Sequence, residues 1–156
     1  MEEIRNQAFR VLARREHSVY ELKGKLSKKF PEQAETIAQV VKEFQEQNWI
    51  SDDRFCEAFI REKILTNNWG TRKIFFQLHK KGIAKDLAQE KMKTLYSEEE
   101  QQTILQELIE KKHQEIIRKG KTKNEYEVRQ KLLAYLVGKG FEFEIAKKAI
   151  DYFSPV

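Results

Sequence analysis

Basic side chains at helical spacing are the residues of this sequence best suited to a defined chemistry, the binding of phosphate groups. Arg54 and Arg61 are seven residues apart, which places them on one face of a helix, and Arg72 and Lys73 begin the next predicted helix. Guanidinium and ammonium groups bind phosphate oxygens through charge-assisted hydrogen bonds. Trp69 is nearby in the sequence, either to stack on a base or to pack in the core. These residues form one candidate face for nucleic acid.

Two further basic groups complete the candidate binding residues. They are Lys80 and Lys81 at the end of the same helix, and Arg10, Arg14 and Arg15 in the first helix of the chain. A purely structural interpretation competes in both places. Lysines at a helix C-terminus interact favourably with the helix dipole, and Glu16 or Glu21 can pair with the arginines.

Local motifs typical of catalysis or metal binding are missing from the sequence. The four His and Cys residues, His17, Cys56, His79 and His113, are scattered, whereas a zinc site needs about four converging ligands. The acid pair Asp52-Asp53 falls where a helix begins, so we interpret it as a helix cap rather than as a general acid and base. We expect no catalytic residues, no metal and no cofactor, although a triad assembled from distant residues leaves no local motif. Cys56 is expected to be a buried thiol on a helix.

Apolar residues recur at intervals of three and four along almost the whole chain, which predicts an all-α fold. Ser18 and Glu21 have the spacing of a capping box and predict the start of a helix that buries Leu22. Pro31 fits the first turn of another helix, which ends near Asn48.

A repeat of about 50 residues divides the chain into similar units. Leu22, Ile74 and Val128 occupy equivalent positions at shifts of 52 and 54 residues. Each unit contains a basic-then-apolar corner: Lys28-Lys29-Phe30, Lys81-Gly82-Ile83 and Lys139-Gly140-Phe141. We predict three tandem three-helix repeats, at residues 1–50, 51–96 and 97–156, which stack into an elongated, curved helical array. A single compact bundle of nine helices is the alternative.

Composition and charge narrow the class of protein further. The 156 residues are 35% charged and 40% hydrophobic and include 17 aromatic side chains, which excludes a disordered chain. The net charge of +5 divides into +1, +4 and 0 over the three predicted repeats. A basic middle repeat favours nucleic acid or an acidic protein groove, but a highly charged helical surface gives the same composition. Without a long apolar run or a signal peptide, we expect a cytoplasmic protein that does not contact membranes. We expect a monomer, because no repeat shows an apolar face beyond what stacking needs.

Two blocks of the sequence resemble a known family. The first block runs from Ala8 to Ser18 and continues with Glu21-Leu22 and Lys25-Leu26, and the second runs from Trp49 to Arg61 and contains Asp52-Asp53-Arg54-Phe55. The likeness continues at Gly70, Arg72, Ile74, Gln77, Leu78, Lys81, Gly82 and Ile83, and more weakly at Arg129, Lys131, Leu132, Leu136, Gly140 and Phe141. By these motifs the sequence is similar to the RecX family of bacterial RecA regulators.

The resemblance implies both a fold and a function. RecX-like proteins consist of tandem three-helix repeats, bind RecA nucleoprotein filaments and inhibit the RecA recombinase and its ATP hydrolysis, and some contact DNA. The chain would then be a non-enzymatic regulator of homologous recombination, DNA repair and the SOS response. Its partners would be the RecA filament and single- or double-stranded DNA. The mechanistic hypothesis is that the protein lies in the filament groove, bridges adjacent RecA subunits and blocks the rearrangements of ATP turnover, or caps a growing end.

Two other functional classes stay open at the level of sequence. A direct DNA-binding module, whose helix pairs enter a groove, explains the basic middle repeat and the repetition. A helical scaffold without a nucleic acid partner explains the helical pattern alone. Assays of RecA ATPase activity and strand exchange at substoichiometric protein separate the three classes, and replacing Arg54, Arg61 and Arg72 by Ala tests the basic face.

Overall fold

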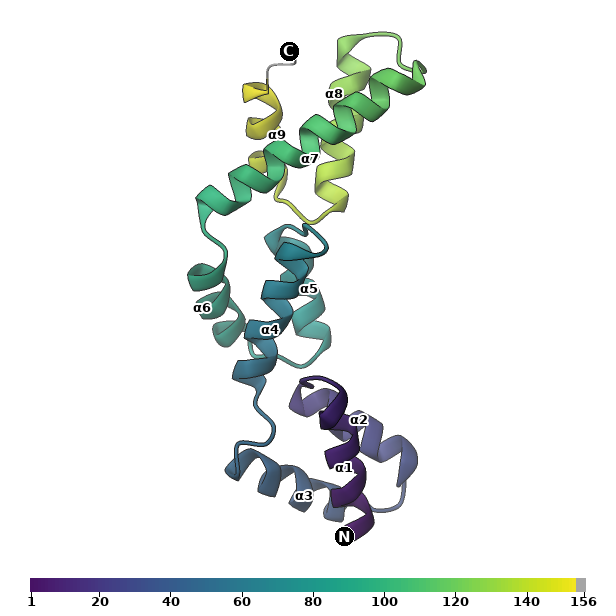
Figure 1. Ribbon diagram of the computed structural model, residues 1–156, viewed down its shortest axis with the longest axis vertical. Coiled ribbons are helices and arrows are strands. Elements are labelled where there is room, and N and C mark those ends of the chain that lie inside the picture. Colours follow the sequence, from purple (N-terminus) through teal and green to yellow (C-terminus); the bar gives the residue numbers. More distant parts are fainter. Residues whose placement is uncertain (154–156) are drawn as a thin grey trace. The chain divides into compact units, whose positions relative to one another are not determined.

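Every regular element in the described part of the chain, residues 1–153, is an α-helix in the computed structural model (Figure 1). The helices are α1 (Glu2–Arg14), α2 (Val19–Lys29), α3 (Ala34–Glu46), α4 (Asp52–Leu65), α5 (Thr71–Lys80), α6 (Lys85–Leu95), α7 (Glu98–Lys119), α8 (Glu125–Gly138) and α9 (Phe143–Tyr152). The predicted all-α fold is therefore confirmed. None of the helices within these residues combines the length and apolar character needed to cross a bilayer. We refer to α1–α3, α4–α6 and α7–α9 as the first, middle and third triplets.

The helices of the first triplet pack around one apolar core (Figure 1). The core consists of Ile4, Ala8, Val11, Leu22, Leu26, Ile37, Val40, Val41, Phe44 and Ile50. The start of α2 is fixed by the predicted capping box. The Ser18 hydroxyl accepts a hydrogen bond from the Glu21 amide at 3.1 Å, and the Glu21 carboxylate accepts one from the Ser18 amide at 3.1 Å. Both partners of the box follow directly from the sequence.

The start of α3 differs from the sequence prediction. Pro31 lies in a turn closed by a hydrogen bond from the Gln33 amide to the Phe30 carbonyl at 3.2 Å, and the helix begins only at Ala34. Phe30 has φ −128° and ψ 66°, outside the helical region, as expected for a residue before proline. The expectation that Pro31 occupies the first turn of α3 is therefore wrong.

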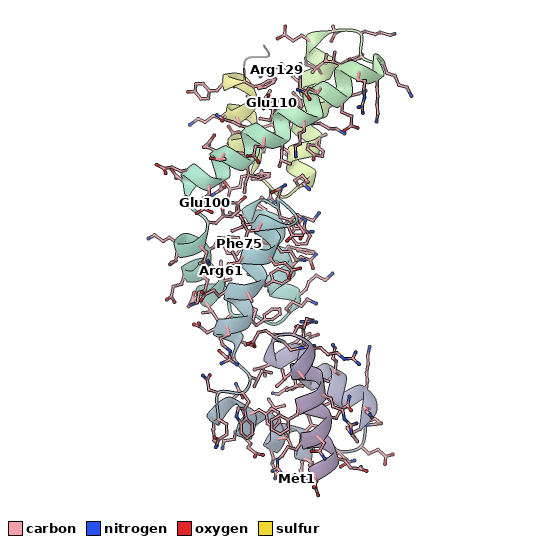
Figure 2. The ribbon with its side chains drawn as sticks, in the orientation of Figure 1. Met1, Arg61, Phe75, Glu100, Glu110 and Arg129 are labelled. Atoms are coloured by element: carbon pink, nitrogen blue, oxygen red, sulfur yellow. The ribbon has the colours of Figure 1, made fainter. Side chains whose placement is uncertain are left out.

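The third triplet has its own core, in which the long helix α7 packs against α8 and α9 (Figure 1). Buried residues of this core include Leu105, Ile109, Leu132, Leu136, Phe141 and Ala146. Ser97 caps α7 by accepting a hydrogen bond from the Glu100 amide, and Gly120 ends the helix in the left-handed conformation with φ 61°. An ion pair between Arg129, labelled in Figure 2, and Asp151 joins α8 to α9.

The middle triplet is shared between two compact units. One unit contains Met1–Arg61 and Gln77–Lys91, and the other contains Glu62–Phe76 and the chain from Met92 onward. Each unit therefore includes one place where the middle triplet meets a neighbouring triplet. We call these places the first junction, between the first and middle triplets, and the second junction, between the middle and third triplets.

Candidate functional site

A basic hollow of about 530 Å³ lies between α1 and α2 in the first triplet. Its lining residues are Gln7, Arg10, Val11, Arg14, Lys25, Lys28 and Lys29. Five of these seven residues are cations, and none of the five forms an ion pair with a carboxylate of residues 1–153. A concave surface lined by charges of one sign concentrates the electrostatic potential and attracts counter-ions. The basic hollow is therefore a surface of the first triplet that attracts anions.

The cations of the basic hollow form two rows. Arg10 and Arg14 are one turn apart on α1, and Lys25 and Lys28 are nearly one turn apart on α2, which packs against α1. The ammonium of Lys29 donates a hydrogen bond to the amide oxygen of Gln7 at 2.9 Å. All five cations are exposed, so an anion can reach them from the solvent.

A buried histidine holds one of these lysines in place. His17 is only 1% exposed, and its ring Nδ1 lies 2.9 Å from the Arg15 carbonyl while its Nε2 lies 2.8 Å from the Lys25 ammonium. Burial lowers the pKa of His17, and the positive charges of Arg15 and Lys25 lower it further, whereas the bond to the carbonyl acts in the opposite direction. In the neutral ring Nδ1 donates to the carbonyl and Nε2 accepts from Lys25. His17 thus serves as a positioning group for a lysine of the basic hollow.

Two other predicted binding residues meet at the first junction, around Glu21. Arg15 donates to both Glu21 carboxylate oxygens, at 3.1 and 2.8 Å, and the Lys81 ammonium donates to the same carboxylate at 3.1 Å. Burial of Glu21 opposes its ionisation, but the hydrogen bonds from Arg15, Ser18 and Lys81 outweigh this effect and lower the pKa of Glu21 to about 2. Arg15 and Lys81 therefore join α2 to the end of α5 through one shared carboxylate.

The arginines predicted on α4 also have protein partners. Arg54 donates to the Glu16 carboxylate at 3.0 Å and to the Asn48 carbonyl at 3.0 Å. Arg61, labelled in Figure 2, pairs with Glu57 one turn before it at 3.0 Å. Arg54 thus ties the segment before α4 to the α1–α2 connection, while Arg61 makes an exposed pair within one helix.

The acid pair at the start of α4 connects helices. A carboxylate oxygen of Asp52 accepts a hydrogen bond from the Val19 amide at 2.8 Å, and Asp53 pairs with Lys91 of α6 at 2.9 Å. The Ser51 hydroxyl accepts from the Arg54 amide at 3.2 Å. The capping function predicted for the acid pair is therefore found at Asp52, but on the first amide of α2 rather than on α4.

The remaining candidates lie at the two ends of α5. Arg72 is exposed, and its backbone amide donates to the Gly140 carbonyl at 2.9 Å across the second junction. The Lys73 ammonium lies 4.8 Å from the centre of the Trp69 ring, and that of Lys63 lies 4.9 Å from it, so both contribute cation–π contacts. Lys80 is exposed at the last residue of α5.

Sequence reasoning found two of the five cations of the basic hollow, Arg10 and Arg14. It missed Lys25, Lys28 and Lys29 as binding residues, because only the packing of α1 on α2 brings the two rows together. The spacing of lysines along α2 was the available signal, but the same spacing is typical of any solvated helix face.

The geometry gives little support to metal binding or to a nucleophilic cysteine. Residues 1–153 contain no group of three or more His, Cys, Asp or Glu side chains that could hold a metal ion. Cys56 is completely buried, and burial raises the pKa of its thiol to about 11, which disfavours the nucleophilic thiolate.

Comparison with known proteins relates all three triplets to one family. The family models for the first, second and third three-helix domains of RecX match residues 5–44, 51–92 and 98–150, in that order. The predicted tandem three-helix repeats are thus confirmed.

Individual relatives agree with the family models. The regulatory protein RecX of Caldanaerobacter subterraneus subsp. tengcongensis is 30% identical over 150 residues, which cover 96% of this chain and 70% of the relative. That of Clostridium perfringens strain SM101 is 29% identical over 94% of this chain and 66% of its own length. The chain thus spans about two thirds of the length of these curated relatives.

A solved structure has the same fold. The crystal structure of RecX from Lactobacillus salivarius aligns with a TM-score of 0.84 at 22% identity, over 96% of this chain and 94% of the other. Since three successive domain models and a relative along almost the whole chain agree, the chain belongs to the RecX family of regulatory proteins.

Proposed function

We propose that this protein binds RecA nucleoprotein filaments and inhibits RecA recombinase and ATPase activity, and so modulates recombination, DNA repair and the SOS response. The observation that carries the proposal is the ordered match of all three triplets to RecX domains, together with relatives named as regulatory protein RecX. The protein acts as a monomer in the cytoplasm, without a cofactor or a catalytic step. Its functional units are the repeats 1–50, 51–96 and 97–156.

The proposed mechanism is steric and electrostatic. Tandem triplets offer similar surfaces at successive positions along one chain, which suits a partner built from repeated subunits. Contacts to neighbouring RecA subunits would oppose the rearrangements that accompany ATP turnover, or would block a growing end. Of the predicted basic residues, Arg61, Arg72 and Lys80 are exposed and keep their place as candidates for contacts to RecA or DNA.

Direct contact with nucleic acid is the second candidate function, and the basic hollow favours it. Two rows of exposed cations without carboxylate partners suit the repeated phosphates of a nucleic acid strand. We assign the main phosphate contact to Arg10, Arg14 and Lys28. Arg54 and Lys81 have a lower rank as contacts because their ion pairs with Glu16 and Glu21 join separate segments of the chain, whereas the pair of Arg61 with Glu57 lies within one helix.

The first experiment measures RecA ATPase activity and strand exchange on single-stranded DNA with increasing amounts of this protein. Inhibition well below one protein per RecA supports a filament regulator. Inhibition only when the protein saturates naked DNA contradicts that function and supports the DNA-binding alternative. The absence of any effect contradicts both and leaves a scaffold.

The second experiment measures the affinity for a fluorescent oligothymidine by anisotropy across a salt series. The variant Arg10→Gln, Arg14→Gln, Lys28→Gln should lower the salt slope by about 2, since each phosphate contact on a single strand contributes about 0.7. The matched control Lys42→Gln, Lys111→Gln, Lys147→Gln removes the same charge from exposed positions outside the hollow. Equal losses in both variants would show that net charge, and not the basic hollow, determines binding.

A further inference from the structure

Each of the two junctions contains a corner of the chain, and the two corners have the same backbone geometry. Ile83 donates its backbone amide to the Leu78 carbonyl at 3.0 Å, and Phe141 donates its amide to the Leu136 carbonyl at 3.2 Å. The glycine before each has a positive φ, 76° at Gly82 and 101° at Gly140. Lys81 and Lys139 precede these glycines and hold equivalent positions.

Each corner packs against the first turn of a helix in the preceding triplet. A Cβ atom at Gly82 would overlap the side chain of Tyr20 in α2, and one at Gly140 would overlap Lys73 in α5. The lysine of each corner therefore lies near the third residue of that helix. Lys81 lies near Glu21 of α2, and Lys139 lies near Lys73 of α5.

The charges at these equivalent positions are opposite. At the first junction Lys81 donates to the Glu21 carboxylate at 3.1 Å. At the second junction Lys73 occupies the position that corresponds to Glu21. Burial lowers the pKa of Lys139, and the positive charge of Lys73 lowers it further, so the two lysines repel each other. Lys139 instead donates to the Asn67 carbonyl at 2.9 Å, and Lys73 lies over Trp69.

The second junction also supplies the cap of α5. The capping residues Ser18 and Glu21 of α2 correspond to Gly70 and Lys73 in α5, which lack the side-chain oxygens of a capping box. The Gly70 amide donates to the Lys139 carbonyl at 2.8 Å and the Arg72 amide donates to the Gly140 carbonyl at 2.9 Å. Thus the third triplet satisfies the first amides of α5, whereas α2 has its own capping box.

Lys73 and Lys139 add a second unfavourable effect at this end of α5. The N-terminus of a helix carries a partial positive charge, and cations placed there are destabilising. The backbone hydrogen bonds of Gly70 and Arg72 therefore form at a place where two lysines repel each other and where the positive end of α5 disfavours both of them. Anions that screen these charges should favour the closed junction.

We propose that the two junctions form a charge-sensitive conformational device in which anions tighten the second junction and loosen the first. Screening weakens the Glu21–Lys81 attraction at the first junction and weakens the Lys73–Lys139 repulsion at the second. In an anionic environment the third triplet therefore docks more firmly and caps α5, while the first triplet gains freedom. The device rests on the contacts at the junctions and does not require the proposed RecA function.

Backbone amides that cross the junctions allow a direct test by hydrogen exchange in the full chain. The Val19 amide, bound to Asp52, reports on the first junction, and the Gly70 and Arg72 amides report on the second. Between about 0.05 and about 0.5 M sodium chloride, where screening shortens from beyond 10 Å to a few Å, exchange should accelerate at Val19 and slow at Gly70 and Arg72. Rates are normalised to an unstructured peptide at each salt concentration.

Reversing the charge of Lys73 at the second junction tests the proposed repulsion directly. Lys73→Glu places an acid next to Lys139 at the second junction, as Glu21 lies next to Lys81 at the first. It should slow exchange at Gly70 and Arg72 about two- to fivefold at low salt. It should also reverse their response to salt. Lys73→Gln removes one charge without creating a pair, so it should give a smaller slowing and should remove most of the salt response.

The matched control is Lys42→Glu, an equal charge change at an exposed position in α3 of the first triplet. It should leave exchange at Gly70 and Arg72 unchanged. A common sign of the salt effect at both junctions, or no slowing in either Lys73 variant, would overturn the proposal. An equal slowing in the Lys42 variant would do the same, because it would trace the effect to net charge.

Discussion

The Glu21 carboxylate and the Lys81 ammonium, 3.1 Å apart, join the second helix of the first triplet to the residue that follows α5. The same carboxylate accepts two hydrogen bonds from Arg15 and one from the Ser18 amide, and its side chain is only 9% exposed. One residue therefore has two structural functions, as the cap of α2 and as the bridge of the first junction. Loss of its charge should affect both.

The first prediction concerns acid stability. The pKa of Glu21 is lowered from 4.5 to about 2, so its ionised form stabilises the folded state fully above pH 4.5, and this stabilisation is lost as the pH falls toward 2. Glu21→Gln keeps the capping geometry but removes the charge. It should reduce the free energy of opening of α2 by about 2–3 kcal/mol at pH 7, measured by hydrogen exchange at Leu22 and its neighbours.

The pH dependence supplies the control for this prediction. Between pH 4.5 and 2 the difference between wild type and Glu21→Gln should shrink, because Glu21 of the unfolded chain takes up a proton in this range while Glu21 of the folded chain still holds its charge. Glu115→Gln, which removes a carboxylate paired with Lys112 and Lys119, should leave stability almost unchanged, because solvent screens these pairs. A difference for Glu21→Gln that persists unchanged at pH 2 would contradict the assignment to its charge.

The second prediction separates junction glycines from an ordinary helical glycine. Gly140→Ala should destabilise the second junction by about 2 kcal/mol or more, because φ is 101° and the new Cβ would overlap Lys73. Gly24→Ala should instead stabilise α2 by about 0.5–1 kcal/mol, since apart from the adjacent backbone of α2 no atom lies within 4 Å of its Cβ position.

Denaturation followed by tryptophan fluorescence can measure the glycine effects. In a Trp49→Phe background the remaining Trp69 reports on the segment next to the second junction, where the Tyr96 hydroxyl donates to its carbonyl at 2.9 Å. The Gly140 variant should lower the denaturant midpoint of this signal. Similar small effects of both glycine variants would argue against close packing at the Gly140 corner.

The sequence indicated most of the fold because its signals are local. The interval of three and four between apolar residues predicts helices, and the Ser18–Glu21 spacing locates the start of α2 to the residue. The corners at Gly82 and Gly140 were also found by repetition. The start of α3 was missed because a proline at a helix start and a proline in a turn look alike in sequence.

The candidate site was less predictable than the fold, because the net charge of a repeat does not show which of its charged side chains lie next to one another. The repeat with the largest net charge, residues 51–96 with +4, places Arg54 and Arg61 beside carboxylates. The repeat with +1, residues 1–50, contains the basic hollow, because its acids face other directions and its cations converge between two helices. Only the packing of α1 on α2 decides this outcome.

The third prediction distinguishes a structural arginine from an exposed one. Arg54→Ala removes the bonds to Glu16 and Asn48 and should lower the free energy of unfolding by about 1–2 kcal/mol, because Asn48 has φ 59° and depends on its surroundings for stability. Arg61→Ala removes one exposed pair within a helix and should cost less than about 0.5 kcal/mol. Chemical denaturation followed by circular dichroism measures both, and equal costs would contradict the structural assignment of Arg54.

The fourth prediction uses the single thiol as a probe of opening. Burial raises the pKa of Cys56 from 9.0 to about 11, and this difference of two pH units reduces the thiolate fraction near pH 8 by about 100-fold. Complete burial adds a steric barrier, so labelling by a disulfide reagent should be at least about 100-fold slower than in the unfolded chain. Low concentrations of denaturant should accelerate labelling, because the reaction then depends on transient opening around α4. Labelling of the native protein at the rate of a free thiol would show that α4 does not bury Cys56 in solution.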